Sequence, residues 1–172
     1  STFQELVDSV KSRPKKTIAV AVAEGNDVLR GIARAHDQGL ADAVLIGNKK
    51  KIIELAKKNN IDIDNYDIIN TTSETQAVVR SIQMVREHLV DTLMKGNCQT
   101  ATLLKGVLDR DHGIRSGKLL SHVAIFELPR YHKLLLMTDG GMNIAPDVPA
   151  KLAIIENAVQ VARSLGIRKP KV

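Results

Sequence analysis

The sequence predicts an α/β fold built around a mostly parallel sheet. Short runs rich in Val, Ile and Leu alternate with segments of helical periodicity along the N-terminal part of the chain. These runs lack polar alternation, which is typical of strands that are buried on both faces. Because strand, helix, strand, helix is the order that right-handed parallel crossovers produce, we expect a three-layer α/β domain.

Each element is assigned from its apolar pattern and its end signals. The expected strands are Thr17–Ala23, Asp42–Ile46, Tyr66–Asn70, Thr92–Lys95, Ser121–Leu128 and Lys133–Thr138. The expected helices are Asp27–Asp37, Asn48–Asn60, Ser73–His88, Thr100–Leu108 and Ala150–Leu165. Ser73 and Gln76 predict a capping box, and Asn26 or Asp27 is the expected N-cap of the first helix. Pro129-Arg130-Tyr131 resembles a hairpin turn, so we expect the last two strands to be antiparallel and the sheet to be mixed.

Composition excludes several classes of function. The chain has 172 residues, with 25 Lys or Arg against 19 Asp or Glu, and the net charge of +6 favours anionic partners. Two Phe, two Tyr and no Trp leave little material for stacking on bases, so we expect no nucleic-acid partner. The single cysteine, Cys98, excludes an internal disulfide and a multi-cysteine metal site, and no metal is expected.

No targeting segment is recognised in the sequence. The longest apolar run, Ile18–Ala23, is far shorter than the ~20 residues of a membrane span. The first residues show no basic region followed by an apolar stretch, as a secretory signal would. We therefore expect a cytoplasmic protein without a membrane partner.

Three familiar site motifs fail on their spacing. The turn Ala23–Asp27 has one glycine where a Rossmann dinucleotide site needs three. In His112–Leu119, Gly113 is one residue too close to Gly117-Lys118 for a P-loop, and Leu119 stands where Ser or Thr would hold magnesium. Ser121 and His122 are neighbours on a strand and point to opposite faces, which excludes a nucleophile–base pair.

Two segments remain as candidate sites. Residues 95–118 carry five cations and two acids: Lys95, Lys105, Arg110, Arg115 and Lys118 against Asp109 and Asp111. This segment is either an anion site, in which Arg115 forks onto phosphate oxygens, or a solvated basic loop. The second segment, Thr138–Pro146, follows a strand and contains Gly140-Gly141, where a ligand can approach the backbone closely. It is either a binding loop or an ordinary turn, and Asp139 and Asn143 favour binding because the turn does not require them.

A set of ordered motifs resembles the phosphate acetyl/butyryltransferase family along essentially the whole chain. The motifs are Leu93–Gly96, Leu104–Leu108, Gly113–Ala124, Tyr131–Leu135 and Thr138–Pro146, preceded by Ala23-Glu24 and Ala41–Gly47. The resemblance implies a fold related to isocitrate and isopropylmalate dehydrogenases, with a cleft between two α/β domains. It also implies acyl transfer between coenzyme A and inorganic phosphate, with no bound cofactor and no metal. The match favours butyryl-CoA, or a similar short or branched acyl-CoA, over acetyl-CoA.

The matched positions supply the candidate site residues, and the chemistry of acyl transfer to phosphate suggests a role for each. Ser121 and Arg115 are the catalytic candidates. Lys95, Gly96, Lys105, Gly140, Gly141 and Asn143 are the candidates for binding phosphate and substrate. The alternatives are a phosphate acetyltransferase and a non-catalytic module that binds phosphate or a nucleotide. A dehydrogenase half-domain of the related fold, with metal-binding aspartates, is a further enzyme alternative.

Family members are roughly twice as long as this chain. We therefore expect residues 1–148 to form the first α/β domain and residues 149–172 to be a connecting helix and the start of a second domain. The acid and base residues of the family would lie in the remainder, which this sequence lacks. The chain alone is expected to be catalytically incomplete, and the enzyme is expected to be a homo-oligomer.

Overall fold

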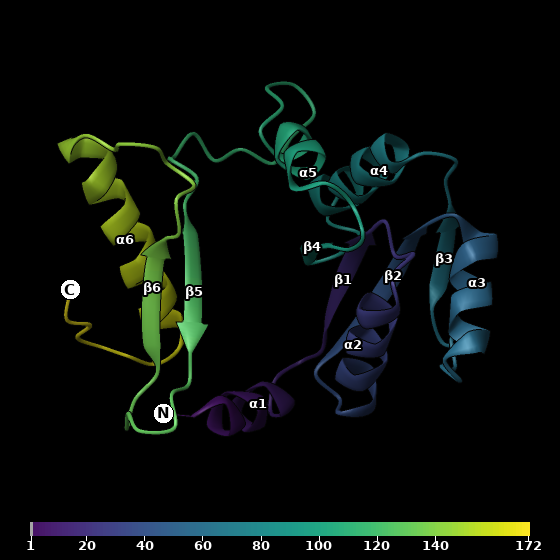
Figure 1. Ribbon diagram of the computed structural model, residues 1–172, viewed down its shortest axis with the longest axis horizontal. Coiled ribbons are helices and arrows are strands. Elements are labelled where there is room, and N and C mark those ends of the chain that lie inside the picture. The colour runs from purple at the N-terminus through teal and green to yellow at the C-terminus, as the bar shows by residue number, and fades with distance from the viewer. Residues whose placement is uncertain (1) are drawn as a thin grey trace. The chain divides into compact units, whose positions relative to one another are not determined.

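The computed structural model describes residues 2–172 (Figure 1). They divide into two compact units. The first, which we call the sheet unit, is Val10–Arg115, and the second, the hairpin unit, is the chain up to Ser9 together with Ser116–Val172. The domain boundary expected between residues 148 and 149 falls at the first residues of the last helix.

The sheet unit is built on four parallel strands. They are β1 (Lys16–Ala21), β2 (Ala41–Gly47), β3 (Asp67–Asn70) and β4 (Thr92–Lys95), in the order β3-β2-β1-β4. The central strand β1 places Ile18 opposite Ala43 of β2 and opposite Thr92 of β4. All four strands lie at the predicted places in the chain, and their parallel order confirms the α/β class.

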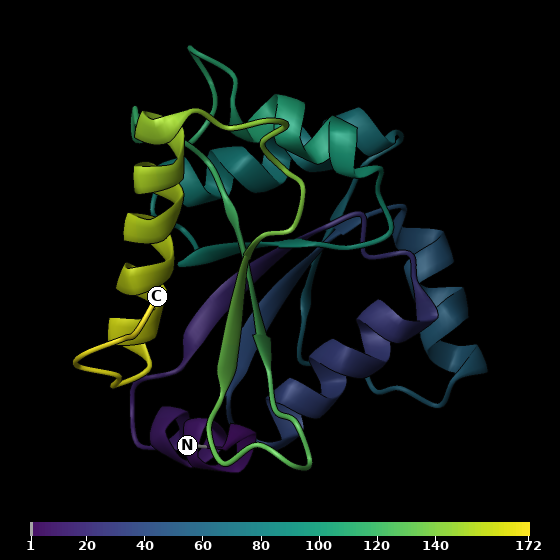
Figure 2. The ribbon, with the colours of Figure 1, turned by 60° about the vertical axis from the view of Figure 1, so that its left-hand side comes forward.

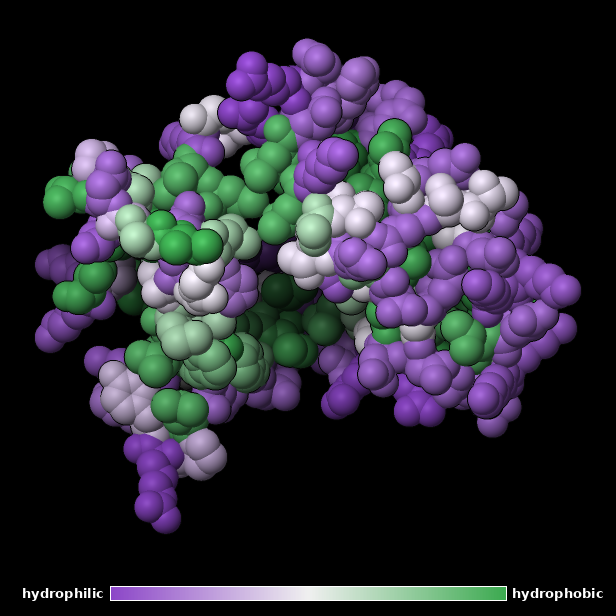
Figure 3. Space-filling view, turned by 45° about the horizontal axis from the view of Figure 1, so that its top comes forward, coloured by the Kyte–Doolittle hydropathy of each residue, from purple (hydrophilic) through white to green (hydrophobic). Residues whose placement is uncertain are grey.

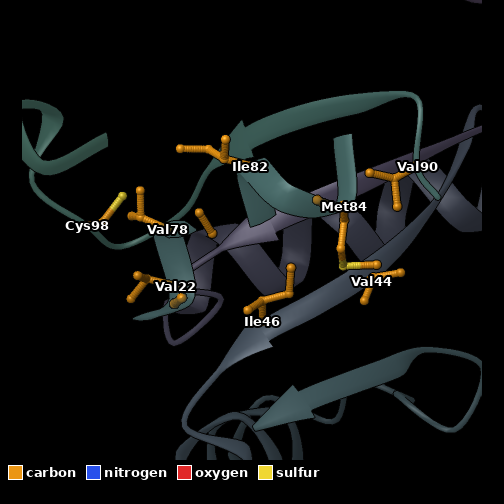
Figure 4. Packing of buried hydrophobic residues seen from close by; sticks show 11 residues of the cluster. Val22, Val44, Ile46, Val78, Ile82, Met84, Val90 and Cys98 are labelled. Atoms are coloured by element: carbon orange, nitrogen blue, oxygen red, sulfur yellow. The ribbon is translucent and has the colours of Figure 1, made fainter. Parts of the chain in front are cut away.

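Helices cover both faces of this sheet. The helices α2 (Asn26–Asp37) and α3 (Lys49–Lys58) pack on one face, where Val20 and Leu45 contribute to a buried cluster with Leu29 and Ile52. The helices α4 (Glu74–Arg86) and α5 (Thr100–Val107) pack on the other face. There, Val44, Ile46, Val78 and Ile82 gather in one cluster (Figure 4). The alternation of strand side chains between the two clusters produces the three layers that the sequence predicts.

The helix caps follow the sequence in one case and depart from it in another. The Ser73 side chain accepts a hydrogen bond from the Gln76 N–H at 3.3 Å, which is one half of the predicted capping box. The other half differs, because Gln76 Oε1 accepts from the N–H and hydroxyl of Thr72. The N-cap of α2 is Gly25, without a side-chain hydrogen bond. The expectation of Asn26 or Asp27 was therefore wrong by at least one residue, because both already lie inside the helix.

The hairpin unit joins two strands and a long helix. The strands β5 (His122–Phe126) and β6 (Leu135–Asp139) pair antiparallel, which confirms the hairpin, and α6 (Val148–Ser164) contacts β6 (Figure 2). The pair forms a two-stranded sheet of its own, so the prediction that it would make the parallel sheet a mixed one was wrong. Apolar runs identify strands, but they carry no information on which edges pair.

One helix has no counterpart in the sequence prediction. The helix α1 (Phe3–Lys11) has Phe3, Leu6, Val7 and Val10 at helical spacing, a signal that was present in the sequence. None of its side chains is fully buried. Among residues 2–172, no helix combines the length and apolar character needed to cross a membrane.

Candidate functional site

The carboxyl edge of the parallel sheet carries the first pair of predicted site residues. Lys95 is the exposed last residue of β4, and Gly96 directly after it is buried. The Gly96 N–H donates to the Ala21 carbonyl at 2.9 Å, and a Cβ at Gly96 would lie 2.6 Å from that oxygen. The close approach of two backbones therefore requires glycine at this position, whatever ligand the edge binds.

A strained turn follows β1 at the same edge. Val22 has a φ of +61°, which is unusual for a β-branched residue. Two bonds from Asn97 hold this turn: its N–H donates to the Val22 carbonyl at 2.7 Å, and its Nδ2 donates to the Glu24 carbonyl at 3.0 Å. The Glu24 carboxylate in turn accepts from the Asn48 N–H at 2.8 Å. The ends of β1, β2 and β4 are thus tied together, and strain of this kind is typical of functional edges.

Cys98 lies close to this edge but is unsuited to nucleophilic catalysis. Its side chain is buried, at 6% exposure. Burial raises the pKa of the thiol, and the opposing charge of Lys95 does not overcome this effect. Because the thiolate is the reactive form, the burial of Cys98 and its raised pKa argue against an acyl-cysteine intermediate. Within residues 2–172, no group of three or more His, Cys, Asp or Glu is arranged to hold a metal ion.

Lys105 projects from α5 into a groove between α4 and α5. The groove has a volume of about 1060 Å³ and an apolar floor that includes Val78, Val79 and Ile82. Arg86 and His112 also line it. In the view of Figure 3, which brings the top of Figure 1 forward, apolar residues (green) are exposed between hydrophilic ones (purple). Lys105 thus supplies positive charge beside an apolar surface.

Arg115 ends the sheet unit after the polar loop that begins at Asp109. The Asp109 carboxylate accepts hydrogen bonds from the N–H groups of His112 at 2.7 Å and Asp111 at 3.0 Å, and these bonds lower its pKa. The Arg115 side chain is exposed and has no hydrogen bond or ion pair within residues 2–172. Its guanidinium is therefore available to an anion, whereas the nearby acid Asp109 is occupied by the loop.

Ser121 lies just before β5 in the hairpin unit and is half-buried. Its Oγ accepts a hydrogen bond from Asn157 Nδ2 of α6 at 2.8 Å. The same Nδ2 also donates to the Leu119 carbonyl at 2.9 Å. The helix thereby fixes the short segment that leads into the strand.

The loop after β6 is organised by Asp139. One carboxylate oxygen accepts from the His122 N–H at 2.8 Å, and the other accepts from the N–H and Nδ2 of Asn143 at 2.6 and 2.8 Å. Asn143 Nδ2 also donates to the Leu120 carbonyl at 3.1 Å, so both hydrogens of this amide are used inside the unit. The interpretation that the turn does not need Asp139 and Asn143 was wrong, because these two side chains brace it.

The pKa of Asp139 reflects this bracing. Desolvation alone would raise the pKa, but the hydrogen bonds from His122 and Asn143 outweigh it, and the pKa lies below its ordinary value. The ionised carboxylate is the form that the folded loop favours.

Gly140 and Gly141 follow with φ values of +67° and +81°. A Cβ at Gly140 would lie 2.9 Å from His122 Nδ1, whereas one at Gly141 would meet nothing within 4 Å. Neither glycine N–H has a hydrogen-bond acceptor in the part of the chain that the structure describes. Both N–H groups are therefore free to bind a ligand.

We expect the hairpin unit to lose stability when Asp139 loses its charge. A lowered pKa means that this stability is complete above the ordinary carboxyl pKa of about 4 and is lost as the pH falls through the folded-state value. Asp139→Asn should therefore be less stable than wild type at pH 7, and the difference should shrink at pH 3. Urea unfolding at both pH values measures this.

The control is Asp64→Asn, which removes an exposed carboxylate that accepts no hydrogen bond within residues 2–172. It should show little difference from wild type at either pH. A gap between Asp139→Asn and wild type that is equally large at pH 3 and pH 7 would contradict the role given to the charge.

The predicted site residues are divided between the two units, four in each. Ser121, Gly140, Gly141 and Asn143 lie in the hairpin unit around the start of β5 and the end of β6, where His122 pairs with Asp139. In the sheet unit, Lys95 and Gly96 lie at the strand edge, Lys105 on α5 and Arg115 at the end of the loop. Sequence reasoning missed Asn97 and Asn157, which act on backbone groups far along the chain and have no local motif.

Comparison with known proteins identifies the family. The family model "Phosphate acetyl/butaryl transferase" matches residues 1–82 and 70–172. Phosphate butyryltransferases of Clostridium acetobutylicum and Clostridium beijerinckii are 38% and 41% identical over 171 and 170 residues, in each case 99% of this chain. The chain spans 57% and 56% of their lengths.

The likeness extends to the three-dimensional structure. The branched-chain phosphotransacylase from Enterococcus faecalis V583 superposes with a TM-score of 0.74 at 29% identity, covering 90% of this chain and 54% of that one. The fold and the sequence thus agree along almost the whole chain, which belongs to the phosphate acetyl/butyryltransferase family.

Proposed function

We propose that the protein with this chain transfers an acyl group, butyryl or a similar short or branched one, between coenzyme A and inorganic phosphate. The observation that carries the proposal is its identity of 38–41% with two phosphate butyryltransferases along 99% of its length. In the reaction, a phosphate oxygen bonds to the thioester carbonyl carbon. The C–S bond breaks, its electron pair leaves on sulfur, and the products are acyl phosphate and the coenzyme A thiolate.

Such a reaction needs cations for phosphate and hydrogen-bond donors for the developing negative charge on oxygen. In this proposal Arg115 binds phosphate by two parallel hydrogen bonds, and Lys105 adds charge. Lys95 and Gly96 border the substrate at the sheet edge. Ser121 and the N–H groups of Gly140 and Gly141 are the donors. Asn143, whose amide hydrogens are already used, holds the loop that presents these glycines.

The test is a thiol assay with the full-length protein, butyryl-CoA, phosphate and a metal chelator. We expect free thiol to appear in proportion to phosphate and to persist with chelator. Butyryl-CoA, isobutyryl-CoA and acetyl-CoA are compared, since a phosphate acetyltransferase, which the family description also names, would prefer the last. Phosphate binding without thiol release would instead identify a non-catalytic binding module and contradict the proposal.

We also propose that the enzyme uses acyl-CoA and phosphate as substrates without a bound cofactor, and that it is a homo-oligomer. Light scattering during gel filtration of the full-length protein measures the oligomeric state. A single species with the mass of one chain would contradict it.

A further inference from the structure

Asn157 is a polar residue on the half-buried side of α6. Ile154, three residues earlier, is buried with 6% exposure, and Val161, four residues later, is half-buried, so both share the side of Asn157. An asparagine among such neighbours needs partners for its amide, and both hydrogens of Nδ2 have one. They are the Leu119 carbonyl at 2.9 Å and the Ser121 hydroxyl oxygen at 2.8 Å.

The Leu119 carbonyl fixes which way the amide faces. A carbonyl oxygen only accepts hydrogen bonds, so the group beside it must be the Nδ2 and not the Oδ1 of Asn157. Since the same nitrogen reaches Ser121, the Ser121 oxygen receives a hydrogen from Asn157 and does not give one. The Leu119 carbonyl, which can only accept, therefore determines the direction of the bond between Asn157 and Ser121.

This direction determines the state of the Ser121 hydroxyl. A serine hydroxyl has one hydrogen to donate and two lone pairs, one of which accepts from Asn157. Within residues 2–172, the hydroxyl hydrogen has no acceptor. It is therefore left for a group outside the protein, and an oxygen with negative charge is the strongest acceptor for it.

We propose that Asn157 is a positioning residue, which keeps the Ser121 hydroxyl as a donor directed at a phosphate oxygen. The inference rests on the proposed function, because that function supplies the phosphate. It adds to the proposed function the residue that keeps the Ser121 hydroxyl available as a donor. Asparagine suits the task because it donates at this position. An aspartate there would accept the Ser121 hydrogen and withdraw it from the ligand.

The variants follow from this argument. Asn157→Ala releases the hydroxyl, and Asn157→Asp reverses the direction of its bond. Ser121→Ala removes the hydroxyl, and the double variant Ser121→Ala/Asn157→Ala tests whether Asn157 acts through it. Gln160→Ala, an exposed position of the same helix, is the control. Thermal unfolding of every variant reports any loss of folded protein.

The first measurement is the kinetics of butyryl-CoA turnover at varied phosphate. We expect Asn157→Ala to lower kcat/KM for phosphate about tenfold and Asn157→Asp about a hundredfold, in line with hydrogen bonds to charged groups. The KM for butyryl-CoA should change little. In the Ser121→Ala background, Asn157→Ala should have no further effect. An equal loss in both backgrounds would mean that Asn157 only stabilises the fold, and it would overturn the proposal.

The second measurement is calorimetric binding of inorganic phosphate to wild type, Asn157→Asp and Gln160→Ala. Weaker binding by Asn157→Asp alone supports the inference even if wild type releases no thiol, an outcome that would defeat only the proposed acyl transfer. Equal affinity of wild type and Asn157→Asp, or no binding by either, overturns the inference itself.

Discussion

Gly96→Ala should destabilise the sheet unit by about 3 kcal/mol, the upper end of the usual cost of overpacking. The added Cβ would lie 2.6 Å from the Ala21 carbonyl oxygen and closer still to that of Val22. These backbone atoms belong to the last residue of β1 and to the turn that follows it, and they cannot rotate away, so β4 must move from β1. The movement would stretch the Gly96 N–H bond to Ala21 and the Asn97 N–H bond to Val22. Urea unfolding measures the loss.

A second glycine provides the matched control. Gly31 lies inside α2, where a Cβ would meet nothing within 4 Å. Gly31→Ala should therefore stabilise the chain by about 0.5–1 kcal/mol, because alanine restricts the unfolded chain and favours helix. The same chemical change thus has opposite signs at two sites. If Gly96→Ala were as stable as wild type, the close approach of β1 and β4 would not exist as described.

The sequence predicted the sheet unit well because its two inner strands, β1 and β2, are buried or half-buried over most of their length. Strands buried on both faces are apolar at nearly every position, and Thr17–Ala23 and Asp42–Ile46 therefore stand out from the helix between them. Pairing is a different question. The antiparallel strands β5 and β6 are equally apolar, yet they form a separate sheet. An apolar run indicates that a segment forms a strand, but it does not indicate which other strand pairs with it.

The candidate site shows the same limit at the level of side chains. Gly140 and Gly141 could be singled out because two adjacent glycines suggest positive φ, and both have it. The function of Asn143 could not be read in the same way, since a free amide and one that braces a carboxylate look identical in sequence. Asn157 gave no signal, because its partner Ser121 is 36 residues away. Chemistry that depends on a distant partner becomes visible only in the fold.

The largest functional effect that we expect is at Arg115. Its guanidinium is exposed and has no hydrogen bond or ion pair within residues 2–172, so a substitution removes no contact of the folded chain. Arg115→Ala should therefore leave thermal unfolding unchanged while raising the phosphate concentration needed for half-maximal turnover about a hundredfold, as for the loss of a charged, two-pronged hydrogen bond. Turnover of butyryl-CoA at varied phosphate measures it.

Arg110→Ala is the matched control for this prediction, because Arg110 is an exposed arginine of the same loop. It removes the same charge from the same region, so any effect of net charge on phosphate attraction appears equally in both variants. Arg115→Lys separates charge from geometry: a lysine keeps the cation but cannot form two parallel bonds to phosphate, and we expect it to recover less than half of the loss. If Arg110→Ala and Arg115→Ala gave the same phosphate curves, the segment would be a solvated basic loop, and Arg115 would have no specific part in binding phosphate.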